Sequence, residues 1–175
     1  MKHRPRSRRS SVAQIDCFTH WDELLASPDE PAPEVHAGRI AAARAALEQM
    51  RSPETASITA WSLCCMVGNV LETMLQQGLV ADPDGLLQDG FDALKRATQA
   101  TRAPGDPVTL PAADFPVVEA MVEDWAAVMV AAPARSIIRA FRATDRRIRD
   151  IEAGRLQPHD YTVTTGAAKA LGARL

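Results

Sequence analysis

Residues 52–78 read SPETASITAWSLCCMVGNVLETMLQQG, and this stretch decides the fold class. Ser52 followed by Pro53 is a typical helix start, and Gly78 is a typical C-terminal stop. Between them, apolar side chains cover most of the helix surface. The narrow polar strip that remains consists of Ser62, Asn69, Thr73 and Gln76. A helix that is apolar on nearly every side is buried, so this stretch predicts the central helix of an all-α bundle.

The same helix is not predicted to cross a membrane. Its longest uncharged run, 55–71, has 17 residues and includes Ser, Thr and Asn, whereas a membrane span needs about 20 mostly apolar residues. No apolar run of signal-peptide length follows the basic N-terminus. Cys17, Cys64 and Cys65 are an odd set without metal-ligand spacing, which is typical of reduced thiols. These features predict a cytoplasmic protein in which Cys64 and Cys65 are small core residues.

Four further helices are predicted, with approximate bounds 34–51, 82–101, 114–133 and 133–154. Asp82 and Pro83 repeat the cap-plus-proline start, Asp114 is a candidate N-cap, and Pro133 ends one helix and begins the next. Apolar residues recur at helical spacing within each segment. The fold prediction is an up-and-down all-α bundle of four to five helices over residues 34–154.

The two ends of the chain are expected to lie outside this bundle. Residues 1–11 are predicted to be a disordered basic tail, and residues 155–175 an extended, loose C-terminal tail whose YTVTT stretch at 161–165 has no partner strand. Residues 12–33 combine a short amphipathic segment, 12–25, with a Pro-rich linker, 27–33. The apolar face of the segment, which we expect to dock on the bundle, consists of Ile15, Phe18, Trp21, Leu24 and Leu25.

Charge is segregated along the chain. Residues 1–15 hold five basic and no acidic residues, and residues 16–124 hold six basic and 18 acidic residues, a net charge of −12. Residues 125–175 hold nine basic and four acidic residues, a net charge of +5. Such asymmetry indicates that the parts face different partners or attract one another.

The predicted helix at 133–154 carries the clearest charge pattern. Spacings of four, three, four and three place five arginines in one row, the arginine stripe: Arg135, Arg139, Arg142, Arg146 and Arg149. The opposite side of the helix is expected to be buried and consists of Ile137, Phe141, Thr144, Ile148 and Ile151.

Two interpretations of the arginine stripe stay open. Asp145, Asp150 and Glu152 lie close enough along the helix to pair with part of it, so the stripe is a solvated face or an intramolecular or subunit contact. Alternatively, the guanidinium groups contact nucleic-acid phosphates. The basic tail would add to this binding through Lys2, Arg4, Arg6, Arg8 and Arg9.

No catalytic, cofactor-binding or metal-binding residue is predicted. Glu72, Glu119, Glu123 and Asp124 lack the Glu-x-x-His or repeated Glu-x-x-Glu pattern of a di-metal bundle site. Cys17 and His20 would be two ligands short of a zinc site, and the HDY triplet at 159–161 has no nucleophile motif with it. A Gly-rich phosphate loop is also absent from the sequence. We therefore expect a protein that is not an enzyme and has no cofactor.

Four stretches resemble a group of small helical proteins from prophages and mobile elements of GC-rich proteobacteria. They are KHRPRSRR (2–9), WSLCCMVGNVLETMLQQGLV (61–80), FDALKRATQATR (91–102) and RSIIRAFRATDRRI (135–148). Such proteins are often labelled transcriptional regulators of the factor-for-inversion-stimulation (Fis) type. The resemblance implies a DNA-binding regulatory role. A helix-turn-helix of that type consists of a compact pair of C-terminal helices joined by a short turn.

The functional prediction is a binding or regulatory protein that uses helical surfaces to engage a protein partner or a second copy of itself. A homodimer is expected because Trp61, Trp125 and the Met-rich helix faces provide a large apolar surface for a bundle of this size, and such a surface needs to be covered. Nucleic-acid binding through the tail and the arginine stripe is the alternative, and a membrane is not an expected partner.

Overall fold

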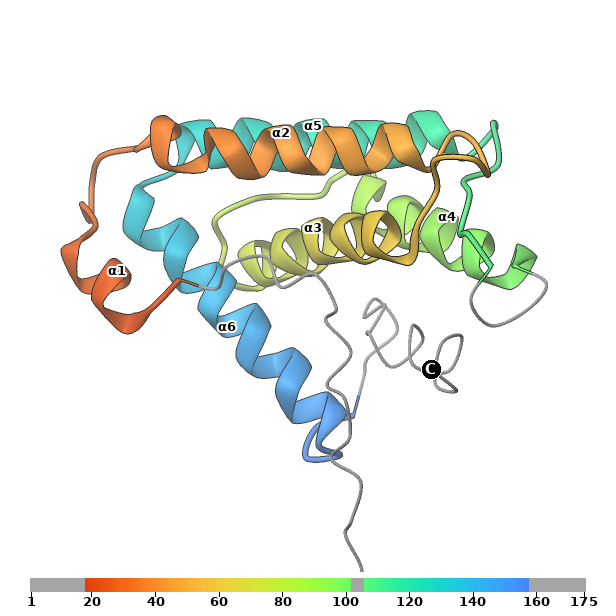
Figure 1. Cartoon of the computed structure of the whole chain (residues 1–175). Coiled ribbons are helices and arrows are strands. Elements are labelled where there is room, and N and C mark those ends of the chain that lie inside the picture. The colour runs from red at the N-terminus through yellow and green to blue at the C-terminus, as the bar shows by residue number, and fades with distance from the viewer. Residues whose placement is uncertain (1–17, 102–105, 158–175) are drawn as a thin grey trace, which may run out of the picture.

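All regular structure in the described residues is helical. The computed structural model describes residues 18–101 and 106–157, and within these ranges the chain forms six helices (Figure 1). They are α1 (His20–Leu25), α2 (Pro33–Gln49), α3 (Ile58–Gln76), α4 (Leu86–Ala100), α5 (Phe115–Ala131) and α6 (Ala134–Glu152). The predicted all-α bundle is confirmed. The predictions for residues 1–11 and 161–165 lie outside the described residues.

Helix α3 is the centre of the bundle, as predicted. It packs against α2, α4, α5 and α6, and Trp61 is fully buried with its indole N–H donating to the carbonyl oxygen of Leu94 at 3.4 Å. By length and composition α3 is the one helix in the described ranges that could cross a membrane, but most of it is buried among the other helices. Its apolar surface is that of a core helix.

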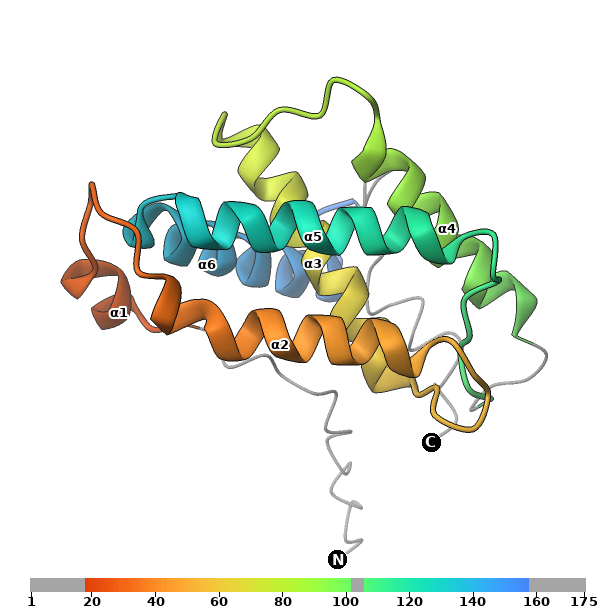
Figure 2. The ribbon, with the colours of Figure 1, turned by 90° about the horizontal axis from the view of Figure 1, so that it is seen from above.

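The bundle has two layers. Helices α2 and α5 lie side by side in one layer, although they are far apart in the sequence (Figure 2). Helices α3 and α4 lie beneath them, and α6 runs diagonally away below α3 (Figure 1). From α2 to α5 each helix reverses the direction of the one before it. Helix α6 packs mainly against α3 and α1, and its Phe141 ring meets the Trp125 ring of α5 edge-on, with centroids 6.4 Å apart.

Two predicted helix starts are displaced. Helix α3 is capped by Ser57, whose hydroxyl accepts from the amide of Ala60 at 3.1 Å, and not by Ser52. Ser52 instead begins a turn in which its carbonyl accepts from the amides of Thr55 and Ala56. The chain needs this turn to reverse between α2 and α3, and the hydroxyl of Thr55 also satisfies the free carbonyl of Gln49 near the end of α2.

Helix α4 begins at Leu86 and not at the predicted Asp82 and Pro83. Asp82 still caps the helix, because its carboxylate accepts from the amide of Leu87 at 3.3 Å across the intervening turn. Gly85 makes this turn possible with a φ of 73°, in the region that favours glycine. Asp114 is the N-cap residue of α5 as predicted, but its side chain accepts from Arg96 and not from its own helix.

The predicted amphipathic segment 12–25 is helical only over α1 in its described part. Thr19 caps α1 in a reciprocal capping box with Asp22. Of the predicted docking face, Phe18 packs edge-on against Phe141 and His36, with ring centroids 5.4 and 5.9 Å away. Trp21, Leu24 and Leu25 are exposed, so the prediction that they dock is wrong, and Ile15 lies outside the described residues.

Burial places two further sets of residues. Asn69 and Thr73, from the polar strip of α3, are buried at the contact with α6. Thr73 and Thr144 of α6 share a hydrogen bond of 2.7 Å there. Trp61 and Trp125, two of the features on which the dimer prediction rested, are buried within a single chain and are not available to a partner.

Candidate functional site

Three arginines of the stripe hold α1 against α6. Arg135 donates to the carbonyl oxygens of Ala26 at 3.0 Å and Leu24 at 3.2 Å. Arg139 and Arg142 both donate to the carboxylate of Glu23. The opposite side of α6 is buried as predicted, with Ile137, Phe141, Thr144 and Ile148 in the interior and Ile151 half-buried. For this part of the stripe, the interpretation as an intramolecular contact is confirmed.

The α1–α6 contact is electrostatically matched. Burial raises the pKa of Glu23, but the hydrogen bonds from Arg139 and Arg142 outweigh it, so the pKa is lowered and Glu23 is an anion at neutral pH. Arg135 satisfies carbonyl groups at the C-terminal end of α1, where a helix lacks internal partners and favours a cation. A helix of six residues has little stability of its own, so these contacts hold it in place.

The far end of the stripe is free of α1. Arg149 pairs with Asp145 one turn before it. Arg146 is exposed and forms no ion pair with any residue that the structure describes. The basic tail residues Lys2, Arg4, Arg6, Arg8 and Arg9 lie outside the described ranges. A nucleic-acid interpretation therefore depends on Arg146, Arg149 and the tail.

Arg147 is a charged residue that the sequence pattern did not reveal. It lies outside the stripe and donates from Nη2 to Oε2 of Glu72 on α3 at 2.5 Å. The same nitrogen donates to the carbonyl of Asn69 at 3.3 Å. In the sequence, Glu72 is the residue that indicates this pair. A buried carboxylate is stabilised by a cation or by hydrogen bonds, and Glu72 lies on an almost wholly apolar helix.

The outward face of α1 presents large apolar side chains to solvent. Trp21 is 70%, Leu24 51% and Leu25 83% exposed. Spacings of three and four place them on one face of the helix. Helix α1 lies at one edge of the molecule beside the start of α6 (Figure 1). We call these three residues the α1 patch. Arg135, Arg139 and Arg142 hold the helix that presents them to solvent.

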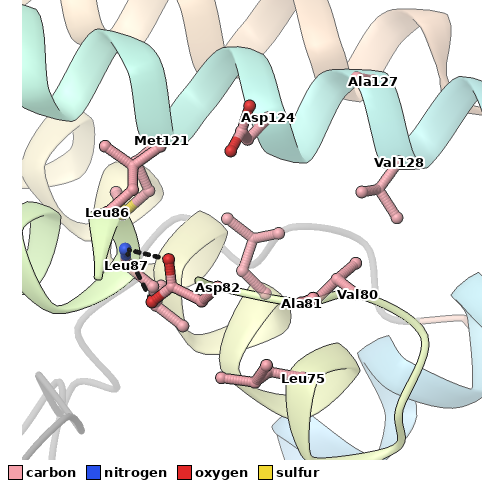
Figure 3. A pocket seen from close by; sticks show the side chains of 11 residues that line it. Leu75, Val80, Ala81, Asp82, Leu86, Leu87, Met121, Asp124, Ala127 and Val128 are labelled. Atoms are coloured by element: carbon pink, nitrogen blue, oxygen red, sulfur yellow. Dashed lines mark hydrogen bonds between the residues drawn. The ribbon is translucent and has the colours of Figure 1, made fainter. Parts of the chain in front are cut away.

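A pocket of about 190 Å³ lies between α3, α5 and the loop that leads into α4 (Figure 3). Leu75, Leu86, Met121 and Val128 contribute to its apolar wall. Asp124 from α5 and Asp82 from the loop reach it from opposite sides (Figure 3). No lysine or arginine lines it among the described residues. We call it the α3–α5 pocket.

A shallower groove of about 760 Å³ runs between α2 and α5. Ala37, Ala41 and Val130 contribute to its lining. Arg44 and Glu123 form a two-pronged pair across it at 2.7 and 2.5 Å, and Glu34 also lines it. One of its two carboxylates is therefore already paired with a cation, whereas no basic side chain lines the α3–α5 pocket among the described residues.

The remaining candidates for chemistry are separated in the structure. Glu119 and Glu123 pair with Arg51 and Arg44, Glu72 pairs with Arg147, and Asp124 lines the α3–α5 pocket. Within the described ranges no group of three His, Cys, Asp or Glu side chains could hold a metal ion. Cys17 and the triplet at 159–161 lie outside those ranges. No protein-family model, curated protein or solved structure matches this chain.

Proposed function

We propose that this protein is a non-enzymatic binding protein that engages a protein partner through the α1 patch. The main observation in support is that Trp21, Leu24 and Leu25 are exposed together on a helix that is fixed in place. Exposed apolar side chains that share a face are typical of interaction sites, and Trp is enriched at the residues that dominate binding energy.

The way in which α1 is held favours tight binding. Without the α6 contacts a six-residue helix would have to order on binding, and ordering reduces affinity. The contacts of Arg135, Arg139 and Arg142 order it in advance. The backbone that carries the patch is therefore ordered before a partner binds.

The charges around the patch define the partner's chemistry. The exposed residues of α1, the following linker and the start of α2 include four carboxylates: Asp22, Asp29, Glu30 and Glu34. A complementary partner has an apolar recess for Trp21 flanked by Lys or Arg, and the opposite charges would steer its approach. A second copy of this chain would bring the same acidic surface to the patch, and like charges repel, so a basic partner is the better fit. A homodimer would therefore use another face.

Site-specific photo-crosslinking in cells of the native host tests this proposal. A photoreactive residue at Trp21 should capture a specific protein, while one at Leu156, which is 45% exposed elsewhere, should not. With that protein purified, Trp21→Ala should weaken binding about thirtyfold, the effect of losing about 2 kcal/mol at an interface hot spot. Leu156→Ala is the matched control. Unchanged affinity of the Trp21 variant, or turnover of a small molecule by the purified protein, would contradict the proposal.

Nucleic-acid binding is the alternative proposal, supported by the exposed end of the arginine stripe and by the basic tail. Duplex affinity should then fall with salt by about 0.9 log units per tenfold salt for each phosphate neutralised. Replacing Arg146, the stripe residue without an ion pair among the described residues, by Gln should flatten this slope by about one contact, and removing residues 1–9 should flatten it further. Arg139→Gln should leave the slope unchanged, because Arg139 binds Glu23. Absence of duplex and single-strand binding at low salt would exclude this alternative.

A further inference from the structure

The α3–α5 pocket combines an apolar interior with two carboxylates and no basic side chain among its described lining residues. Its volume of about 190 Å³ is formed mainly by aliphatic side chains. For comparison, an apolar protein cavity of about 150 Å³ accommodates benzene. The pocket therefore has room for a group about the size of one aromatic ring.

The two carboxylates of the pocket differ in how they are held. Asp82 is oriented by the amide of Leu87, to which both of its oxygens lie 3.3 Å away. It occupies the N-terminal end of α4, the position that would otherwise attract an anionic ligand. Asp124 is exposed and forms no hydrogen bond or ion pair with any other described residue. The charge of the pocket therefore excludes anions and favours a cation.

Met121 forms part of the apolar wall of the pocket. It lies so close to Gly90 that a Cβ atom at position 90 would be 2.6 Å from its sulfur. The glycine thus makes room for the buried Met121 side chain between α4 and α5. No aromatic ring lines the pocket among the described residues, so the carboxylates provide the recognition of charge.

We propose that the α3–α5 pocket binds a small organic amine: an ammonium group attached to an apolar group of about the size of a phenyl ring. The ammonium would lie between Asp82 and Asp124, and its N–H groups would donate to carboxylate oxygens. The apolar group would occupy the interior formed by Leu75, Met121 and Val128. This site is separate from the α1 patch, so a negative result here would leave the proposed function untouched.

Binding of 2-phenylethylamine to the full-length protein tests the proposal, with calorimetry for affinity and amide chemical shifts for location. The expected result is saturable binding that shifts resonances of α4, α5 and the loop between α3 and α4. The uncharged 2-phenylethanol and the anionic 3-phenylpropionate should bind at least about tenfold more weakly, because a hydrogen bond to a charged group contributes about 1.5 kcal/mol or more. Equal binding of the amine and the alcohol would overturn the proposed charge recognition.

Variants locate the site. Asp124→Asn should weaken amine binding about tenfold, and Asp89→Asn, which removes an exposed charge of α4 outside the pocket, should not. Ala127→Leu fills the pocket without changing charge and should abolish binding of both the amine and the alcohol. Undiminished binding to the Ala127 variant would overturn the location. Binding of a Lys-containing peptide without binding of the free amine would overturn the small-ligand proposal in favour of a protein ligand.

Discussion

Glu72 of α3 and Arg147 of α6 form an interior ion pair, with Oε2 and Nη2 2.5 Å apart and side chains only 3% and 11% exposed. Asn69 and the hydrogen-bonded pair Thr73 and Thr144 lie beside it. The contact between α3 and α6 is thus partly polar, in contrast to the apolar packing elsewhere in the core. Each of the two buried charges is stabilised only while the other lies within hydrogen-bond distance. The pair therefore restricts how α6 can lie along α3.

Removing one partner of this pair should destabilise the fold strongly. We expect Glu72→Met or Arg147→Met to lower the free energy of unfolding by about 3–5 kcal/mol, since a buried charge is left without its partner. Replacing both by methionine should cost much less than the sum of the two losses. Urea denaturation of the four proteins measures this cycle. Glu119→Ala is the control, because its pair with Arg51 is half exposed and should contribute less than about 1 kcal/mol. A small effect of both single variants would contradict the prediction.

His36 should make stability depend on pH. It is fully buried beside Phe18, and desolvation together with the nearby charge of Arg39 lowers its pKa, while Glu34 acts weakly in the opposite direction. The unfolded chain then binds a proton that the folded chain does not, so stability is lost as pH falls below about 6.5, the ordinary value, towards the lowered folded pKa. Chemical denaturation between pH 7 and pH 5, compared for the native protein, His36→Leu and His20→Gln, measures this. A slope that persists in the His36 variant would show that another group is responsible.

Two helix glycines should respond oppositely to alanine. A Cβ atom at Gly68 would lie 2.8 Å from the buried ring of Phe91, so Gly68→Ala should destabilise the protein by about 1–3 kcal/mol through overpacking between α3 and α4. No atom lies within 4 Å of a Cβ atom at Gly38 in α2. Gly38→Ala should therefore stabilise by up to about 1 kcal/mol through helix propensity alone. Thermal unfolding of the two variants tests the contrast, and a stabilised Gly68 variant would mean that Phe91 moves without cost.

Cys64 and Cys65 should be unreactive in the folded protein. Desolvation raises the pKa of Cys64 to about 12 and that of Cys65 well above its usual range, so little thiolate exists at pH 8. In a Cys17→Ser background, a thiol reagent should label neither cysteine under native conditions and both in denaturant. Fast labelling of the native protein would show that α3 opens readily.

The contact of Glu23 should control the mobility of α1. We expect Glu23→Gln to raise amide hydrogen exchange in residues 20–26 about fivefold, since ion pairs of this kind contribute about 1 kcal/mol or less. Exchange in α2 to α5 should stay unchanged. Glu48→Gln, which breaks a surface pair with Arg51, is the matched control. If exchange in α1 were equal in the two variants, the hydrogen bonds of Arg135 alone would suffice to hold α1.

The helices were predictable because their signals are local. The apolar run of α3, the stop at Gly78, and the turn at Pro133 depend on neighbouring residues and on a period that any isolated stretch displays. Because these signals are local, they do not determine at which residue a helix begins. Ser52 and Ser57 are both suitable N-caps in sequence terms, and only the turn that brings α3 back along α2 selects Ser57.

By itself, the sequence determined the all-α class, the central place of α3, and the two sides of α6. It could not determine what covers a charged side, because a guanidinium is equally satisfied by water, a phosphate or another part of the chain. The tertiary structure decided that Arg135, Arg139 and Arg142 bind α1, that Arg147 meets Glu72, and that Trp21 is exposed while Trp61 is buried. Each of these depends on partners tens of residues away in the sequence. Such distant contacts form only when the whole chain packs, and for that reason they are not encoded in a local pattern.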